Sequence, residues 1–203
     1  MNGSDYLNQI SASNRPTSKP SIFSSKILKF ALIGGAAAIF IIVVGSMLKN
    51  FSTKKSDLLE QANLRMTNLT ASITTYNRNI KSSRLRSMNV SLSGVFADST
   101  RNITNILTTE YEYDPKKPNS NITDEETTLI GDFNTTMEDA KLNGILDRIW
   151  VREMTLQLAL LISLESEAAA RSSEPSTIKT LEDSQASLNQ LYEQFSAFAD
   201  STN

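Results

Sequence analysis

The sequence of 203 residues contains no cysteine and no histidine. The chain therefore has no thiol nucleophile, no disulfide, no Cys or His metal ligand and no imidazole for acid–base catalysis. Glycine-rich phosphate loops, dinucleotide fingerprints and calcium loops are also missing from the sequence. We therefore expect a protein that is not an enzyme, with no catalytic, cofactor-binding or metal-binding residues and no cofactor.

Charge is missing from one stretch, Phe30 to Leu48, which is bracketed by Lys29 and Lys49. Its 19 residues would form a helix of roughly 28 Å, close to the thickness of the hydrocarbon core of a bilayer. The stretch is longer than the apolar part of a cleaved signal peptide, and no good cleavage site follows it. We predict a transmembrane signal anchor within residues 26–50, so that the membrane bilayer is one partner of the chain.

The residues before this stretch predict the orientation of the chain. Residues 1–25 are rich in Ser, Asn and Thr and lack apolar periodicity, which indicates a disordered basic tail. Lysine and arginine are equally frequent on the two sides of the anchor. A short tail stays inside, however, whereas a long following region is translocated largely regardless of its charge. We expect a single-pass protein of the cell membrane with a cytoplasmic amino terminus and an extracytoplasmic domain, residues 51–203.

Proline is scarce in that domain, where only Pro115, Pro118 and Pro175 occur. Because proline breaks helix interiors, these positions divide the domain into long uninterrupted segments. Residues 114–121 read as a loop, and Pro175 stands where a final helix would begin.

Apolar residues recur at steps of three and four within these segments, which predicts helices that pack together or form coiled coils. The first stripe comprises Leu59, Ala62, Met66, Leu69, Ile73, Tyr76 and Ile80. The second comprises Leu85, Met88, Leu92, Val95, Ser99, Ile103 (or Asn102) and Ile106. The last comprises Ile178, Leu181, Gln185, Leu188, Tyr192, Phe195 and Ala199.

The phase slips between the first two stripes, so residues 58–112 form either one long helix with a stutter or a hairpin that turns near residues 81–86. We favour the hairpin, because helices of about equal length then follow along the whole chain. A short strand around Val90 and Leu92 is a third alternative. Residues 145–170 are the most apolar segment of the domain and are expected to form the central helix.

Local motifs predict the ends of the helix before that central segment. Thr123 and Glu126 have the spacing of a capping box, in which Thr caps the helix and Glu reaches back. Asn143 and Gly144 are suited to a left-handed helix end.

Charge is unevenly distributed along the domain. Residues 51–110 hold eight Lys or Arg against four acids, and residues 111–203 hold seven against seventeen, giving +4 and −10. We expect helices from the two halves to pack with facing charges. The same pairing is expected of a basic patch formed by Arg78, Lys81, Arg84 and Arg86, and binding of an anion is the alternative. A net charge of −2 gives no indication of a nucleic-acid partner.

Two further features are expected to be structural. Glu165 and Glu167 diverge on a helix and should lie on a solvated face. Trp150, the single tryptophan, should be a core or interface anchor, with a ligand-stacking platform as the alternative.

The fold class predicted from the sequence is all-α: a single N-terminal transmembrane helix followed by an antiparallel bundle of four or five helices. The layout resembles the extracytoplasmic helical bundles of bacterial membrane sensors, without their second span and signalling domain. The first functional hypothesis is a structural or interaction protein of the cell envelope that binds a protein partner or associates with itself. The alternative is a ligand-binding or sensor module that signals through a separate membrane partner.

Overall fold

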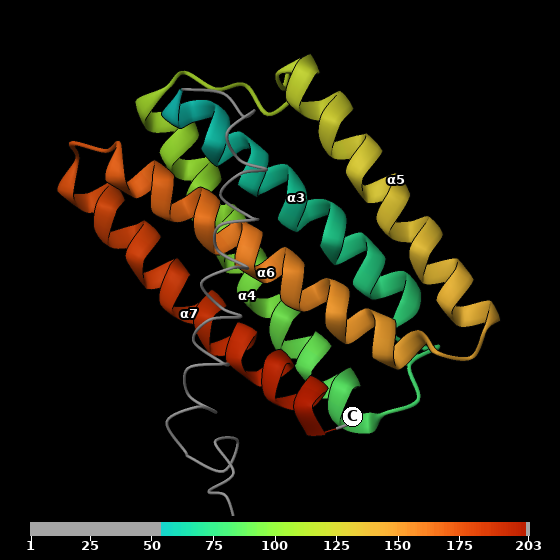
Figure 1. The fold of residues 1–203 in the computed structure, drawn as a ribbon. Coiled ribbons are helices and arrows are strands. Elements are labelled where there is room, and N and C mark those ends of the chain that lie inside the picture. Colours follow the sequence, from blue (N-terminus) through green and yellow to red (C-terminus); the bar gives the residue numbers. More distant parts are fainter. Residues whose placement is uncertain (1–53, 202–203) are drawn as a thin grey trace, which may run out of the picture. The chain divides into compact units, whose positions relative to one another are not determined.

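A computed structural model of the chain describes residues 54–201, which form five α-helices and no strand. The helices are α3 (Lys55–Tyr76), α4 (Ser83–Glu110), α5 (Ser120–Leu142), α6 (Leu146–Ala170) and α7 (Pro175–Ser201). Consecutive helices run in opposite directions (Figure 1). The prediction of an all-α bundle of four or five helices is therefore confirmed for these residues, and the number is five.

Between residues 54 and 201, no helix has both the length and the apolar character that crossing a membrane requires. The predicted anchor, residues 26–50, and the predicted tail, residues 1–25, lie outside the described residues.

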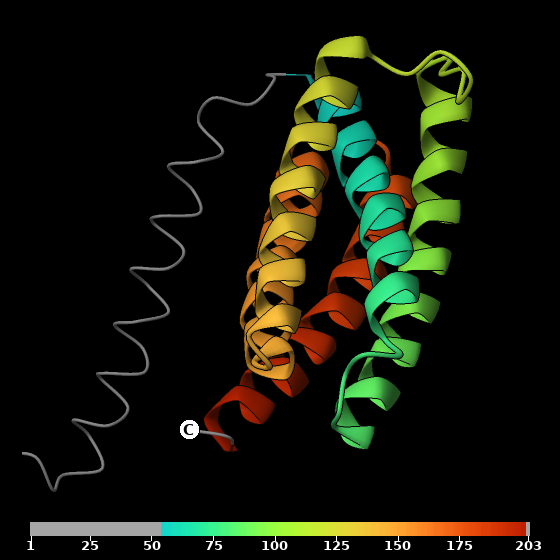
Figure 2. The same cartoon turned by 90° about the vertical axis from the view of Figure 1, so that its right-hand side faces the viewer.

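Four of the helices form a ring in the order α3, α4, α7, α6, and α5 packs outside this ring against both α3 and α6 (Figure 2). Both α3 and α6 therefore have three helical neighbours. This position explains why α3 buries polar side chains as well as apolar ones, since little of its circumference is left for solvent. The central position expected for residues 145–170 is shared by α3.

The first apolar stripe is confirmed at every position. Its seven residues from Leu59 to Ile80 are all buried. The stripe ends in the connection between α3 and α4, residues 77–82, where the chain reverses. Ser82 caps α4 by accepting a hydrogen bond from the backbone N–H of Leu85 at 3.2 Å. Residues 58–112 are thus a hairpin, and its turn lies slightly before the expected position.

Two other stripes are correct in part. In α4, Phe96 is buried where Val95 was expected, and the other predicted positions hold. In α7, Leu181, Leu188 and Phe195 are buried as expected. The other four buried positions lie one residue earlier than predicted, and are Thr177, Ser184, Leu191 and Phe198. In both helices the neighbouring helices decide which of two adjacent residues is covered, and in α7 they cover Thr177 rather than the more apolar Ile178.

The predictions for the two ends of α5 had different outcomes. The capping-box prediction is wrong, because α5 begins at Ser120 and its cap is Asn119, which accepts from the N–H of Asn121. The predicted C-terminal cap is confirmed. Gly144 has a φ of 70°, and the N–H of Ile145 reaches back to the carbonyl of Ala140 at 2.9 Å. A hydrogen bond that closes a turn of six residues is characteristic of a Schellman motif. This motif requires a residue in the left-handed backbone conformation and therefore favours glycine.

Candidate functional site

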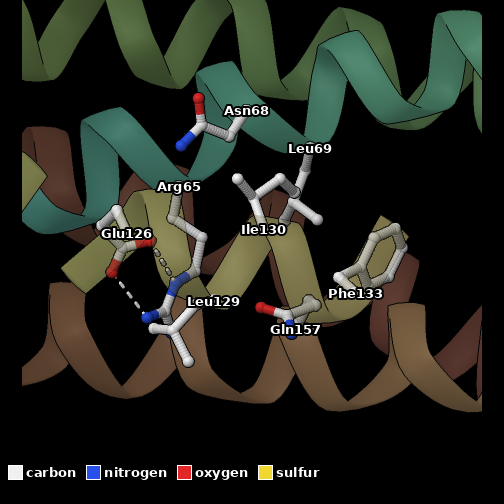
Figure 3. Close-up of a pocket in the computed structure, with 8 residues that line it drawn as sticks. All are labelled: Arg65, Asn68, Leu69, Glu126, Leu129, Ile130, Phe133 and Gln157. Carbon is white, nitrogen blue, oxygen red and sulfur yellow. Dashed lines mark hydrogen bonds and ion pairs between the residues drawn. The ribbon is translucent and has the colours of Figure 1, made fainter. Parts of the chain in front are cut away.

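A buried ion pair joins α3 to α5. Arg65 donates from Nε to one carboxylate oxygen of Glu126 at 3.0 Å and from Nη2 to the other at 2.6 Å (Figure 3). The two side chains are 5% and 3% exposed. This bidentate geometry satisfies both carboxylate oxygens, which a buried charge requires. Glu126 is therefore an interhelical partner rather than the reciprocal cap predicted from its spacing.

The space beside this ion pair is small. Its volume is about 10 Å³, and it is lined by Arg65, Asn68, Leu69, Glu126, Leu129, Ile130, Phe133 and Gln157 (Figure 3). That volume is about the least that accommodates one water molecule. The arrangement fastens α5 to the ring and offers no room for an organic ligand.

Trp150 is enclosed by other side chains. It is 0% exposed, and its ring centroid lies 6.0 Å from that of Tyr76 and 5.9 Å from that of Phe133. Its indole Nε1 donates to Oδ1 of Asn89 at 2.9 Å, and Nδ2 of Asn89 donates to Asn77 at 3.1 Å. The indole thus has its polar partner inside the core, and its position matches the expected core anchor rather than a stacking platform.

A second buried polar group links three helices of the ring. Ser184 of α7 donates to Oε1 of Glu165 of α6 at 2.9 Å, and the hydroxyls of Ser184 and Ser99 of α4 are 2.7 Å apart. Because Ser184 has a single hydroxyl proton, Ser99 is the donor in the second bond. Glu165 Oε2 has no hydrogen-bond partner among the described residues. Burial, opposed in part by the hydrogen bond from Ser184, raises the pKa of Glu165 to about 8.

This cluster corrects the prediction that Glu165 lies on a solvated face, since its exposed fraction is 0%. The sequence did contain a signal for its burial. Met154, Leu158, Leu161, Glu165 and Ala168 are spaced by four, three, four and three residues, so Glu165 occupies a core position of a heptad. A carboxyl next to two hydroxyls suggests proton transfer, but all three side chains are buried and none is presented to a substrate.

A surface hollow of about 480 Å³ lies at the end of the bundle that holds the α3–α4 and α5–α6 connections. We call it the basic hollow, and it is lined by Asn79, Lys81, Lys141, Gly144, Ile145, Leu146, Asp147 and Arg148. Its lining contains three cations and one carboxylate. That carboxylate, of Asp147, accepts hydrogen bonds from the backbone N–H groups of Lys81 at 2.9 Å and Ser82 at 2.8 Å.

The basic patch predicted at Arg78, Lys81, Arg84 and Arg86 borders this hollow through Lys81. Within residues 54–201 none of its four side chains forms an ion pair, so the expected pairing with the acidic half is absent there. Arg86 donates to the backbone carbonyl of Ile80, and Arg84 lies 5.6 Å from the ring centroid of Phe198. In the structure, Lys141 and Arg148 lie at the same end of the bundle. They are far from the basic patch in sequence, so the sequence alone does not group them with it.

At the opposite end of the bundle, the cation Lys55 is paired with a carboxylate. Lys55 donates to Glu110 at 3.0 Å and to the hydroxyl of Ser172 at 2.8 Å. Burial raises the pKa of Glu110, but hydrogen bonds from Thr177 and Lys55 outweigh it and hold that pKa below its ordinary value. The charge of Lys55 is therefore neutralised by Glu110, in contrast to Lys81 and Arg148 of the basic hollow, which form no ion pair among the described residues.

In the described part of the chain, no group of three or more Asp or Glu residues is placed to hold a metal ion. Comparisons with protein-family models, with curated proteins and with solved structures found no match.

Proposed function

We propose that this protein is a single-pass, membrane-anchored helical bundle with a non-enzymatic role at the cell envelope, in which the bundle binds another protein. The proposal of an anchor rests on the uncharged stretch from Phe30 to Leu48. The extracytoplasmic position of the bundle follows from the length of chain behind that stretch.

One observation supports protein binding above the others: two large apolar side chains, Leu142 and Ile145, are exposed where α5 connects to α6, and Ile145 lines the basic hollow. Leu142 is 80% exposed and Ile145 is 37% exposed, although both belong to a tightly capped helix end. Exposed apolar side chains beside a concave surface are typical of sites where another protein binds. The sensor alternative needs space between helices, and the 10 Å³ beside Arg65 and Glu126 gives it little support.

Site-specific photo-crosslinking in native membranes tests this role. A photoreactive amino acid at Leu142 should give a discrete adduct with another protein, whereas the same group at Lys116, exposed in the loop at the opposite end, should not. Equal labelling from both positions, or no adduct from Leu142, would contradict the proposal.

The orientation is tested separately by a reporter fused after Asn203. An enzyme that is active only outside the cytoplasm should work there. If it is silent while a cytoplasmic reporter is active at the same position, the proposed topology is wrong.

A further inference from the structure

We propose that the basic hollow binds an acidic segment of the partner protein, with the carboxylates of the segment at Lys81 and Arg148 and its apolar side chains on Leu142 and Ile145. This inference rests on the proposed function and specifies the face and the chemistry of the partner. It assigns to the bundle a peptide-binding site.

The electrostatics of the hollow favour an anionic ligand. Among the described residues, neither Lys81 nor Arg148 forms an ion pair. Lys141 pairs with Glu138 at 3.2 Å, but both side chains are about half exposed, so this pair is weak and easily exchanged. The one carboxylate of the lining, Asp147, already accepts two backbone N–H groups, which reduces its repulsion of a second anion.

The walls of the hollow are held in place by the fold. The hydrogen bonds from Lys81 and Ser82 to Asp147 fix the α3–α4 connection to the start of α6. On the other side, the Schellman motif fixes Gly144 and Ile145 at the end of α5. The protein side of such a pre-formed surface loses little conformational entropy on binding, which reduces the cost that the contacts must offset.

The exposed apolar residues distinguish an acidic polypeptide from a simple anion. A phosphate or a nucleic-acid backbone would use the cations but leave Leu142 and Ile145 in water. A peptide that carries both carboxylates and apolar side chains would engage both features. The volume of about 480 Å³ is similar to that of pockets that bind small ligands, which is room enough for a few side chains of a peptide.

Residues 1–53 and 202–203 of this sequence do not supply such a segment. Residues 1–53 and 202–203, which the structure does not describe, contain five Lys or Arg and a single acid, Asp5. Their charge has the same sign as the hollow. These residues therefore do not complement the hollow, and we assign the acidic segment to the partner protein.

Fluorescence anisotropy with the full-length protein in phosphatidylcholine nanodiscs tests the inference. The probe is a short fluorescein-labelled peptide of alternating Glu and Leu pairs, and a second peptide carries serine in place of leucine. We expect the double variant Lys81→Glu/Arg148→Glu to weaken binding of the first peptide about tenfold or more. Added salt should weaken it as well, because the charges are exposed.

Two variants serve as controls and separate the contributions. Lys116→Glu/Lys117→Glu makes the same change in charge on exposed lysines at the opposite end and should alter affinity by less than about twofold. Leu142→Ser should weaken binding of the leucine peptide and leave the serine peptide unaffected. Thermal unfolding by circular dichroism verifies that each variant is folded, which we expect since all substituted side chains are exposed.

Several results would overturn the inference. The first is no binding to the wild-type protein, and the second is a Lys81→Glu/Arg148→Glu variant that binds within about twofold of wild type. Equal affinity for the serine peptide, inorganic polyphosphate or a DNA duplex would identify a general polyanion site instead. Binding only to vesicles that contain phosphatidylserine would identify a lipid site, and self-association lost in the double variant would identify a second copy as the occupant. If the adduct from Leu142 persists in the double variant, the proposed function stands while this inference fails.

Discussion

Replacing the carboxyl of Glu165 by the amide of glutamine is expected to stabilise the bundle at neutral and alkaline pH. Glu165 is fully buried and receives one described hydrogen bond, from Ser184, while its Oε2 has no partner among the described residues. Burial, partly offset by that bond, raises the pKa of Glu165 to about 8. Glutamine keeps the shape and the Oε1 acceptor but has no charge to desolvate.

The magnitude follows from proton linkage. The ordinary pKa of the glutamate carboxyl is 4.5, so between pH 4.5 and about 8 the folded protein holds a proton that the unfolded chain has released. Unfolding then releases a proton, and the free energy of unfolding falls by about 1.4 kcal/mol for each pH unit. This stabilisation is complete below pH 4.5 and is lost as the pH rises through 8. About 3 kcal/mol is lost by pH 7 and about 5 kcal/mol above pH 8, out of a total stability of roughly 5–15 kcal/mol.

Urea unfolding of a fragment from Ser52 to Asn203 provides the assay. Trp150 is the single tryptophan and is buried, so its fluorescence reports the loss of the core. The difference in unfolding free energy between Glu165→Gln and wild type should shift in favour of Glu165→Gln by about 4 kcal/mol between about pH 5 and about pH 8.5. Glu182→Gln is the matched control, because it makes the same change at an exposed carboxyl of α7.

Parallel pH profiles for Glu165→Gln and wild type would refute the reasoning. They would mean that Glu165 is ionised in the folded protein with an ordinary pKa, and hence that its carboxylate has a polar partner or access to water. A pH-dependent difference in Glu182→Gln of the same size would assign the effect to overall charge instead.

Three other substitutions test the packing by the same unfolding assay. Gly131→Ala should stabilise by about 0.5–1 kcal/mol, because a Cβ there meets open space in a helix, whereas Gly144→Ala should destabilise by about 1 kcal/mol at its φ of 70°; equal effects would contradict this. Arg65→Met should cost about 3–5 kcal/mol by leaving a buried carboxylate unpaired, and adding Glu126→Leu should recover most of it; a double variant as unstable as the single one would contradict this. Because Ile73 is buried, Ile73→Asp should unfold the domain or separate its helices. Circular dichroism measures the thermal unfolding and sedimentation measures the mass; if neither differs from wild type, Ile73 does not occupy a core position.

The amino-acid sequence by itself determined the helices, their approximate number and several of their ends. The heptad from Leu59 to Ile80 is regular, so every predicted position is buried. Gly144 and Pro175 mark helix ends because their backbone preferences are local and independent of partners. Signals of this kind act within a few residues, although the local capping-box spacing of Thr123 and Glu126 was overridden by the tertiary contact of Glu126 with Arg65.

The tertiary structure alone decided which helices meet and therefore which polar residues become buried. Glu126 was predicted as a local cap, but α5 packs against α3 and brings it to Arg65, 61 residues away in sequence. The phase of α7 was set by its neighbours, which placed Ser184 against Glu165. The basic hollow likewise depends on two connections that lie about sixty residues apart and meet only in the folded bundle. Periodicity indicates that one face of a helix is buried, but the exact phase of that face and its partner depend on the free energy of packing all five helices together, which no local pattern encodes.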